Sequence, residues 1–276
     1  MKRHTLLALA LLPLGSALAQ DEHAHHEHHE PAPREPAASA SSDHVPPDPP
    51  SHVMGPMSNA EMAQIMAMDD AAPFGSIALD RLEWRERSDA IAWEGSAWYG
   101  GDYNKLMLKS EGESADGADH LRTELLWDRA ISRWWHMQAG LRHDSGEGPS
   151  RTWAALGVEG LAPYWIELEA TAYVGEEGRT ALRAEGSYDL RFTQRLILQP
   201  QFEINFYGKD DPERGLGSGL SDVQAALRLR YEIRREFAPF IGVHWSGLFG
   251  GTADIAEAQD RDDSEVQFVA GLKVWF

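Results

Sequence analysis

The chain has 276 residues, no cysteine and a formal net charge of −19 at pH 7. The absence of cysteine excludes disulfides and thiolate metal sites, so any soft-metal chemistry would fall to histidine and methionine. The acidic balance excludes a nucleic-acid partner, which requires a basic surface. The negative mean hydropathy excludes a helical membrane protein but not a β-barrel, in which half of each strand faces a polar interior.

The first 19 residues have the pattern of a secretory signal peptide. Lys2 and Arg3 precede an apolar run over Leu6–Leu14, and Ala17-Leu18-Ala19 forms an A-x-A cleavage site, so we expect the mature chain to start near Gln20. The run is too short to span a bilayer as a helix, and no later segment approaches the ~20 apolar residues that a spanning helix needs. The exported chain is therefore a periplasmic protein or a closed barrel.

Residues 20–73 are rich in His, Pro, Ala, Ser and Met, and such a composition predicts a disordered arm. Its histidines are ligands for borderline metals such as copper, nickel or zinc, although an inert solubilising tail is the alternative. The candidate histidine ligands are His23, His25, His26, His28, His29, His44 and His52.

Five methionines follow within fifteen residues of the same arm, and soft thioethers select Cu(I) over zinc and nickel. Alternatively, a capping box at Ser58–Glu61 could open a short helix whose methionines pack as an apolar face. Histidine and methionine clusters together favour copper, which neither cluster alone would do. The candidate methionine ligands are Met54, Met57, Met62, Met66 and Met68.

From about Ile77 the chain alternates apolar and polar residues between turn signals, which predicts about twelve strands. The last strand is the clearest, because every second residue from Val266 to Phe276 is apolar. The predicted strands are 78–87, 90–99, 103–113, 120–130, 134–144, 150–161, 164–174, 182–192, 195–207, 222–234, 238–249 and 265–276.

This pattern predicts an all-β fold for residues 74–276, a transmembrane antiparallel up-and-down β-barrel in the bacterial outer membrane. Short turns near Ser88, Ser132, Ala162, Thr193 and Arg235 would lie at the periplasmic end, opposite longer polar loops. Tryptophans near strand ends fit interfacial girdles. The alternative is a soluble lipocalin-like barrel or a β-sandwich.

Several long segments carry a resemblance to a known family. They are W-Y-G-G-D-Y-N-K-L-M-L-K-S-E-G-E at 98–113, Q-A-G-L-R-H-D at 138–144, and further blocks at 148–165, 193–200, 207–222 and 229–243. In these the chain resembles the copper resistance protein B family of outer-membrane barrels. The resemblance implies copper binding and copper tolerance at the outer membrane, and the family's variable His- and Met-rich arm corresponds to residues 20–73 only as a residue class.

Alternation also places many opposed charges in the lumen, which predicts a lattice of ion pairs rather than an open pore. Met107, His136 and His244 would face the same lumen and become candidate copper-relay ligands if they converge. The favoured alternative is that each is an isolated lumen residue whose neighbours satisfy it, since a metal site needs convergent ligands.

We therefore predict a non-enzymatic outer-membrane protein, a monomer whose periplasmic arm binds copper for sequestration or export. A periplasmic copper-binding protein is a possible partner, besides copper ions and outer-membrane lipid. One alternative is a general porin with an incidental tail. Another is a lipid hydrolase, because His143 and Ser145 share a strand face, but no orienting third group or oxyanion hole can be identified.

Overall fold

The computed structural model describes residues 73–276 apart from 116–117 and 147. The predicted signal peptide (1–19) lies outside the described residues, and so does the arm with all twelve of its candidate ligands. Within the described part, no helix is both long and apolar enough to cross a membrane.

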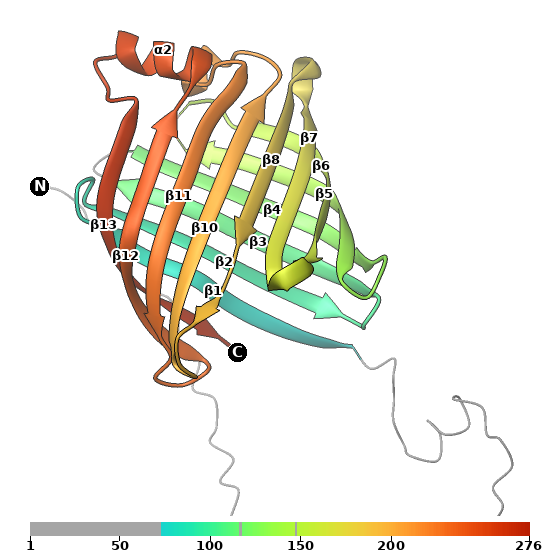
Figure 1. Ribbon diagram of the computed structural model, residues 1–276. Helices are drawn as coiled ribbons and strands as arrows, with labels where there is room; N and C mark the ends of the chain where they lie inside the picture. Colours follow the sequence, from blue (N-terminus) through green and yellow to red (C-terminus); the bar gives the residue numbers. More distant parts are fainter. Residues whose placement is uncertain (1–72, 116–117, 147) are drawn as a thin grey trace, which may run out of the picture. The chain divides into compact units, whose positions relative to one another are not determined.

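The described residues form one antiparallel sheet that closes on itself, because the first strand pairs with the last. Figure 1 shows the strands inclined around the barrel. The strands are β1 (Phe74–Arg85), β2 (Ala90–Gly100), β3 (Asn104–Ala115), β4 (Ala118–Ala130), β5 (Trp135–Gly146), β6 (Arg151–Ala162), β7 (Ile166–Gly175), β8 (Thr180–Ser187), β9 (Leu190–Arg191), β10 (Leu196–Tyr207), β11 (Gly219–Tyr231), β12 (Phe237–Leu248) and β13 (Ser264–Trp275).

The two-residue β9 continues β8, because both pair with β10. Together they form one interrupted strand, which makes twelve strand positions around the barrel. The predicted all-β barrel of about twelve strands is therefore confirmed. An even number lets both ends of the barrel domain lie at the same edge, as in single-chain bacterial barrels.

Alternation along β13 shows why these sequences close into a barrel with an apolar outside. Phe268 is 67% exposed on the outer face, while its neighbours Gln267 and Val269 are buried in the lumen. β10, β11 and β12 show the same arrangement, with large apolar side chains outside and charged or polar side chains inside. This is the reverse of the distribution in a soluble protein. An outside of this kind is stable only against an apolar solvent, which excludes the soluble alternatives.

The two ends of the barrel differ in the length of their connections. Turns 101–103, 131–134, 163–165, 192–195 and 232–236 lie at one end, with Phe74 and Phe276, and we call this the short-turn end. The longest connections, 208–218 and 249–263, lie at the other, the long-loop end (Figure 1). The prediction for the turn near Ser88 was wrong. It follows the first strand away from the short-turn end, so it lies with the long loops.

Helix α2 (Gly250–Ala258) belongs to the 249–263 connection, and its buried Thr252 joins it to the neighbouring loop. The hydroxyl of Thr252 accepts a hydrogen bond from the Gly217 amide at 2.9 Å and lies 2.9 Å from the Ser221 hydroxyl. A Cβ on Gly217 would lie 2.3 Å from the carbonyl carbon of Gly251, so only glycine permits this approach.

Candidate functional site

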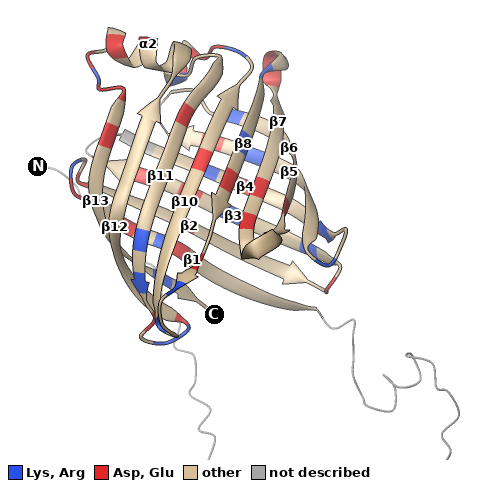
Figure 2. Ribbon diagram, in the orientation of Figure 1, with Lys and Arg blue, Asp and Glu red and all other residues tan. Residues whose placement is uncertain are grey.

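Charged side chains fill the middle of the lumen. Lysines and arginines lie close to aspartates and glutamates on the strands all around the barrel (Figure 2). We call the central set the ion-pair lattice, and it consists of Glu83, Glu94, Glu111, Glu203, Arg81, Arg122, Arg183 and Arg228. The predicted lattice of opposed charges is thus present.

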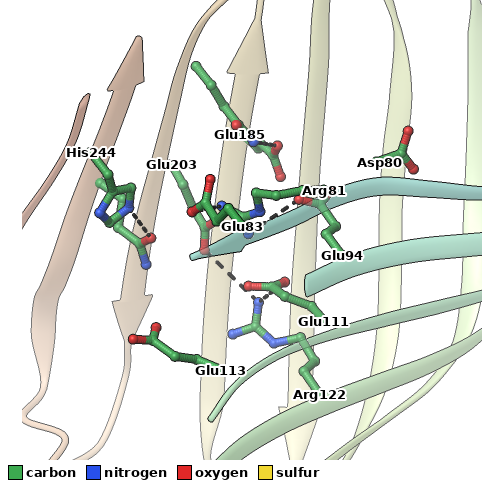
Figure 3. Close-up of polar contacts among 12 residues, drawn as sticks. Asp80, Arg81, Glu83, Glu94, Glu111, Glu113, Arg122, Glu185, Glu203 and His244 are labelled. Atoms are coloured by element: carbon green, nitrogen blue, oxygen red, sulfur yellow. Dashed lines mark hydrogen bonds and ion pairs between the residues drawn. The ribbon is translucent and has the colours of Figure 1, made fainter. Parts of the chain in front are cut away.

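Arg183 of β8 pairs with three carboxylates of the lumen. Its Nη2 lies 3.1 Å from Glu111, 3.2 Å from Glu185 and 2.9 Å from Glu203. Arg122 of β4 approaches Glu111 at 3.4 Å, so β3, β4, β8 and β10 are tied together across the lumen. Figure 3 shows Glu111, Arg122 and Glu203 pointing toward one another from different strands.

A β-bulge in β1 places two further charged residues near the lumen. The register slips by one residue between Leu79 and Arg81, so Asp80 and Arg81 follow one another without the usual alternation. Arg81 reaches Glu94 at 3.4 Å, and Asp80 pairs with Lys273 at 2.8 Å. Bulges commonly re-aim side chains near functional sites.

Below the lattice lies a cavity of about 590 Å³ that extends to the 131–134 turn at the short-turn end. We call it the vestibule. Its charged lining is mixed: Glu159, Glu167, Glu169 and Glu185 come from β6, β7 and β8, whereas Arg228, Arg230 and Lys273 come from β11 and β13. Lys109 pairs with Glu159 and Glu169, and Arg183 pairs with Glu185, so a cation entering the vestibule would compete with these two side chains for the carboxylates.

Two of the three predicted lumen ligands lie together on the acidic side. His136 Nδ1 lies 2.7 Å from Asp128 Oδ1, and Gln138 Nε2 contacts Met107 Sδ at 3.6 Å. The same Gln138 amide donates to Asp128 Oδ2 at 3.1 Å and to Glu159 Oε2 at 2.7 Å. Gln138 therefore joins Met107 and His136 into one polar group.

His244 lies apart from them on β12, at the other wall of the barrel. Its Nε2 is 3.2 Å from Gln224 Oε1, and its Nδ1 has no partner within the described part of the chain, although the residue is only 2% exposed (Figure 3). The three predicted lumen ligands therefore do not converge as a set. In the described part of the chain, no three histidine and acidic side chains already form a metal-binding group.

Residues 73–276 match a family model described as copper resistance protein B precursor. The chain belongs to the copper resistance protein B family. It is 46% identical to copper resistance protein B of Escherichia coli over 213 residues, which cover 76% of this chain and 72% of that protein. It is 40% identical to a homolog from Pseudomonas syringae pv. tomato over 277 residues, covering 97% and 92%.

Among solved structures, the chain is similar in fold to the NanC porin, with a TM-score of 0.50 and 13% sequence identity. The match covers 72% of this chain and 98% of the porin. At this identity the likeness concerns the fold alone. This member of the copper resistance protein B family thus has a porin-like outer-membrane barrel whose lumen is crossed by ion pairs.

The structure also shows how His143 and Ser145, the two residues considered for a lipid hydrolase, are arranged. His143 faces outward, and its Nδ1 lies 3.0 Å from the Thr152 hydroxyl of β6. Neither nitrogen of His143 hydrogen-bonds Ser145 within the described residues. A serine without a base has no activated nucleophile, so the arrangement gives hydrolysis no support.

Reasoning from the sequence missed the parts of the site that depend on neighbours in space. Gln138 was not predicted as a member, because a single glutamine on a lumen face carries no signal of its own. Asp80 and Arg81 were missed because the bulge breaks the alternation used to assign the lumen. The two consecutive charged residues, which break the alternation of the strand, were the sign available in the sequence.

At the long-loop end, Asp211 ties the 208–218 loop to the barrel rim. Arg151 donates two hydrogen bonds to its carboxylate, at 2.8 and 3.1 Å, and Arg179 lies 3.6 Å away. These hydrogen bonds, above all, hold the pKa of Asp211 below its usual value. The adjacent Asp210 accepts the Ser218 amide at 2.6 Å, which also lowers its pKa.

Proposed function

We propose that this protein binds copper at the outer membrane through its arm, either to sequester the metal or to export it. The observation that carries the proposal is membership of the copper resistance protein B family together with twelve histidine and methionine side chains between residues 23 and 68. We further propose that the arm lies in the periplasm, that the chain is a monomer and that a periplasmic protein delivers the copper.

Copper suits this mixture of ligands better than other divalent metals do. Imidazoles bind Cu(II), and thioethers bind Cu(I) while rejecting zinc and nickel. Closely spaced weak ligands raise the local ligand concentration, so an ion released by one group is captured by the next. Such a chain retains copper while leaving it exchangeable, which both storage and transfer require.

The barrel geometry is compatible with transfer of copper from the arm to the lumen. The barrel begins at Phe74, which pairs with Gly100 beside the 101–103 turn at the short-turn end. The vestibule opens at this same end and concentrates carboxylates on one wall. Copper released near Phe74 would therefore meet these carboxylates without having to cross the bilayer.

Metal titration of the mature protein beside a variant lacking residues 20–70 tests the proposal, using Cu(I), Cu(II), Zn(II) and Ni(II). We expect a preference for copper and the loss of most bound copper with the arm. If the truncated protein retains its copper, the arm is not the main site. If zinc or nickel binds equally well, the assignment to copper fails.

The fold similarity to a porin supports a general channel as a second candidate function. The ion-pair lattice opposes it, because Arg183 on β8 pairs across the lumen with Glu111 on β3, and Arg122 on β4 lies 4.0 Å from Glu203 on β10. Single-channel recording in a planar bilayer separates the two. A general porin would show steady conductance that ignores deletion of residues 20–70, whereas we expect the resting barrel to conduct little.

A further inference from the structure

We propose that the vestibule holds a second metal site, formed by Met107, His136 and Glu159 and kept closed by Lys109 and Gln138. It would take a soft or borderline cation such as Cu(I) or Cu(II). Its assignment to copper rests on the proposed function, but its existence rests on four geometric observations within the barrel.

The first observation is the orientation of His136. Asp128 Oδ1 lies 2.7 Å from Nδ1 of the ring, so the carboxylate fixes the ring and favours the tautomer with its proton on Nδ1. The other nitrogen, Nε2, makes no hydrogen bond within the described residues, and His136 lines the vestibule. A carboxylate–histidine pair of this kind orients the histidines that bind metals in proteins.

The second observation is an excess of acceptors around Gln138. Its Nε2 lies within 3.6 Å of one sulfur and two carboxylate oxygens, from Met107, Asp128 and Glu159. An amide group has two hydrogens, so it cannot serve three acceptors fully. A sulfur and an oxygen that converge on one position are a donor set that a cation would satisfy better than an amide.

The third observation is that the ammonium group of Lys109 already lies beside Glu159 and Gln138. Lys109 Nζ lies 2.8 Å from Glu169 Oε2, 3.0 Å from Glu159 Oε2 and 3.3 Å from Gln138 Oε1. An ammonium has three hydrogens, and here all three have acceptors. Lys109 therefore acts as a tethered cation, that is, a positive charge held in place by the protein itself. Glu159 Oε2 contacts both this ammonium and the Gln138 amide that reaches Met107.

The fourth observation is a carboxylate oxygen without a partner. Glu124 lines the vestibule and is only 2% exposed. Its Oε1 accepts from the Tyr173 hydroxyl at 2.8 Å, but its Oε2 has no hydrogen-bond partner among the described residues. Buried carboxylate oxygens are rarely left unpaired, so this oxygen is free to interact with a bound cation or with its water.

These observations describe one sequence of events. A cation that enters from the short-turn end displaces the Lys109 ammonium from Glu159, and the Gln138 amide turns away from Met107. His136 Nε2, Met107 Sδ and a Glu159 oxygen then become available together. His136 lies directly opposite Glu159 on the neighbouring strand, and Met107 Sδ and Glu159 Oε2 both lie within 3.6 Å of Gln138 Nε2, which places the three side chains around the same polar group.

The test uses the full-length mature protein with methionine labelled by 13C at its methyl groups, titrated with silver nitrate. Ag(I) is a redox-stable substitute for Cu(I). Met107 is assigned with Met107→Leu. Met137 on the same barrel alternates to the outer face and serves as an internal control. We expect the Met107 methyl to shift on binding while the Met137 methyl stays in place.

Variants then define the site. His136→Gln should weaken the Met107 response roughly tenfold or more, as loss of an oriented ligand does. The matched control His143→Gln removes an outward histidine from the same strand and should change nothing. Lys109→Gln removes the tethered cation and should shift the Met107 transition to lower Ag(I).

The outcomes separate this inference from the proposed function, because the five arm methionines report on the arm. If the arm methyls shift and Met107 does not, the vestibule site is overturned and the proposed function stands. If Met107 shifts alone, the vestibule site stands and the arm proposal fails. Equal shifts at Met107 and Met137 would indicate unspecific binding and would overturn the inference.

Discussion

Replacing Arg183 by methionine should destabilise the barrel strongly, because one guanidinium nitrogen serves three carboxylates. Arg183 Nη2 lies 2.9 to 3.2 Å from Glu203, Glu111 and Glu185. Breaking a buried ion pair by removing one partner costs about 3–5 kcal/mol, since the remaining charge is left uncompensated. This corresponds to roughly two to four powers of ten in the folding equilibrium.

The free energy of unfolding would be measured by denaturant titration in lipid vesicles, followed by tryptophan fluorescence. Arg183→Met combined with Glu203→Gln removes one charge of each sign and should recover part of the loss. Arg195→Met, an exposed arginine in the 192–195 turn, should change the free energy by no more than about 0.5 kcal/mol.

Two results would refute this reasoning. A loss below about 1 kcal/mol for Arg183→Met would mean that water compensates the carboxylates as well as the guanidinium does, as for exposed ion pairs. A double variant less stable than the single one would mean that Glu203 stabilises the barrel for reasons other than its charge.

Three further predictions concern the connections and the strand contacts. Asp211 has a lowered pKa in the folded protein, so its stabilising effect is complete above its unfolded pKa of about 3.9 and is lost as the pH falls through the folded value. The protection of the 208–218 loop against hydrogen exchange, taken relative to the intrinsic rate at each pH, should therefore fall in acid, and Asp211→Asn should make it low at every pH. Tyr164 adopts φ of 69° in a turn, where a non-glycine residue is strained. Tyr164→Gly should thus stabilise the detergent-solubilised barrel by about 1 kcal/mol in a thermal melt, and no gain would argue that its 83% exposed ring contributes as much as the strain removes. A Cβ on Gly140 would lie 2.0 Å from the Leu125 carbonyl oxygen, so Gly140→Ala should destabilise by about 1–3 kcal/mol in denaturant titration, and an unchanged midpoint would contradict the close β4–β5 contact.

Much of the fold could be predicted from local sequence. A strand has a side-chain period of two, and in a lipid-facing barrel that period separates most apolar from charged residues over long runs. The segment from Arg195 to Tyr207 shows this, because its phenylalanines face outward while Glu203 and Asn205 are buried in the lumen. The strand count followed from the same pattern, and the His- and Met-rich arm remains a prediction from composition.

The sequence by itself determined the strands, the inside and outside of each and the chemical character of the lumen, because those depend on residues one or two positions apart. Only the tertiary structure decided which lumen side chains meet. Closing the sheet fixes contacts between distant strands, and this brings Met107 and His136 together through Gln138 while leaving His244 on another wall. The β1 bulge adds Arg81 to the lattice, because a one-residue slip in register reverses the face of every side chain that follows.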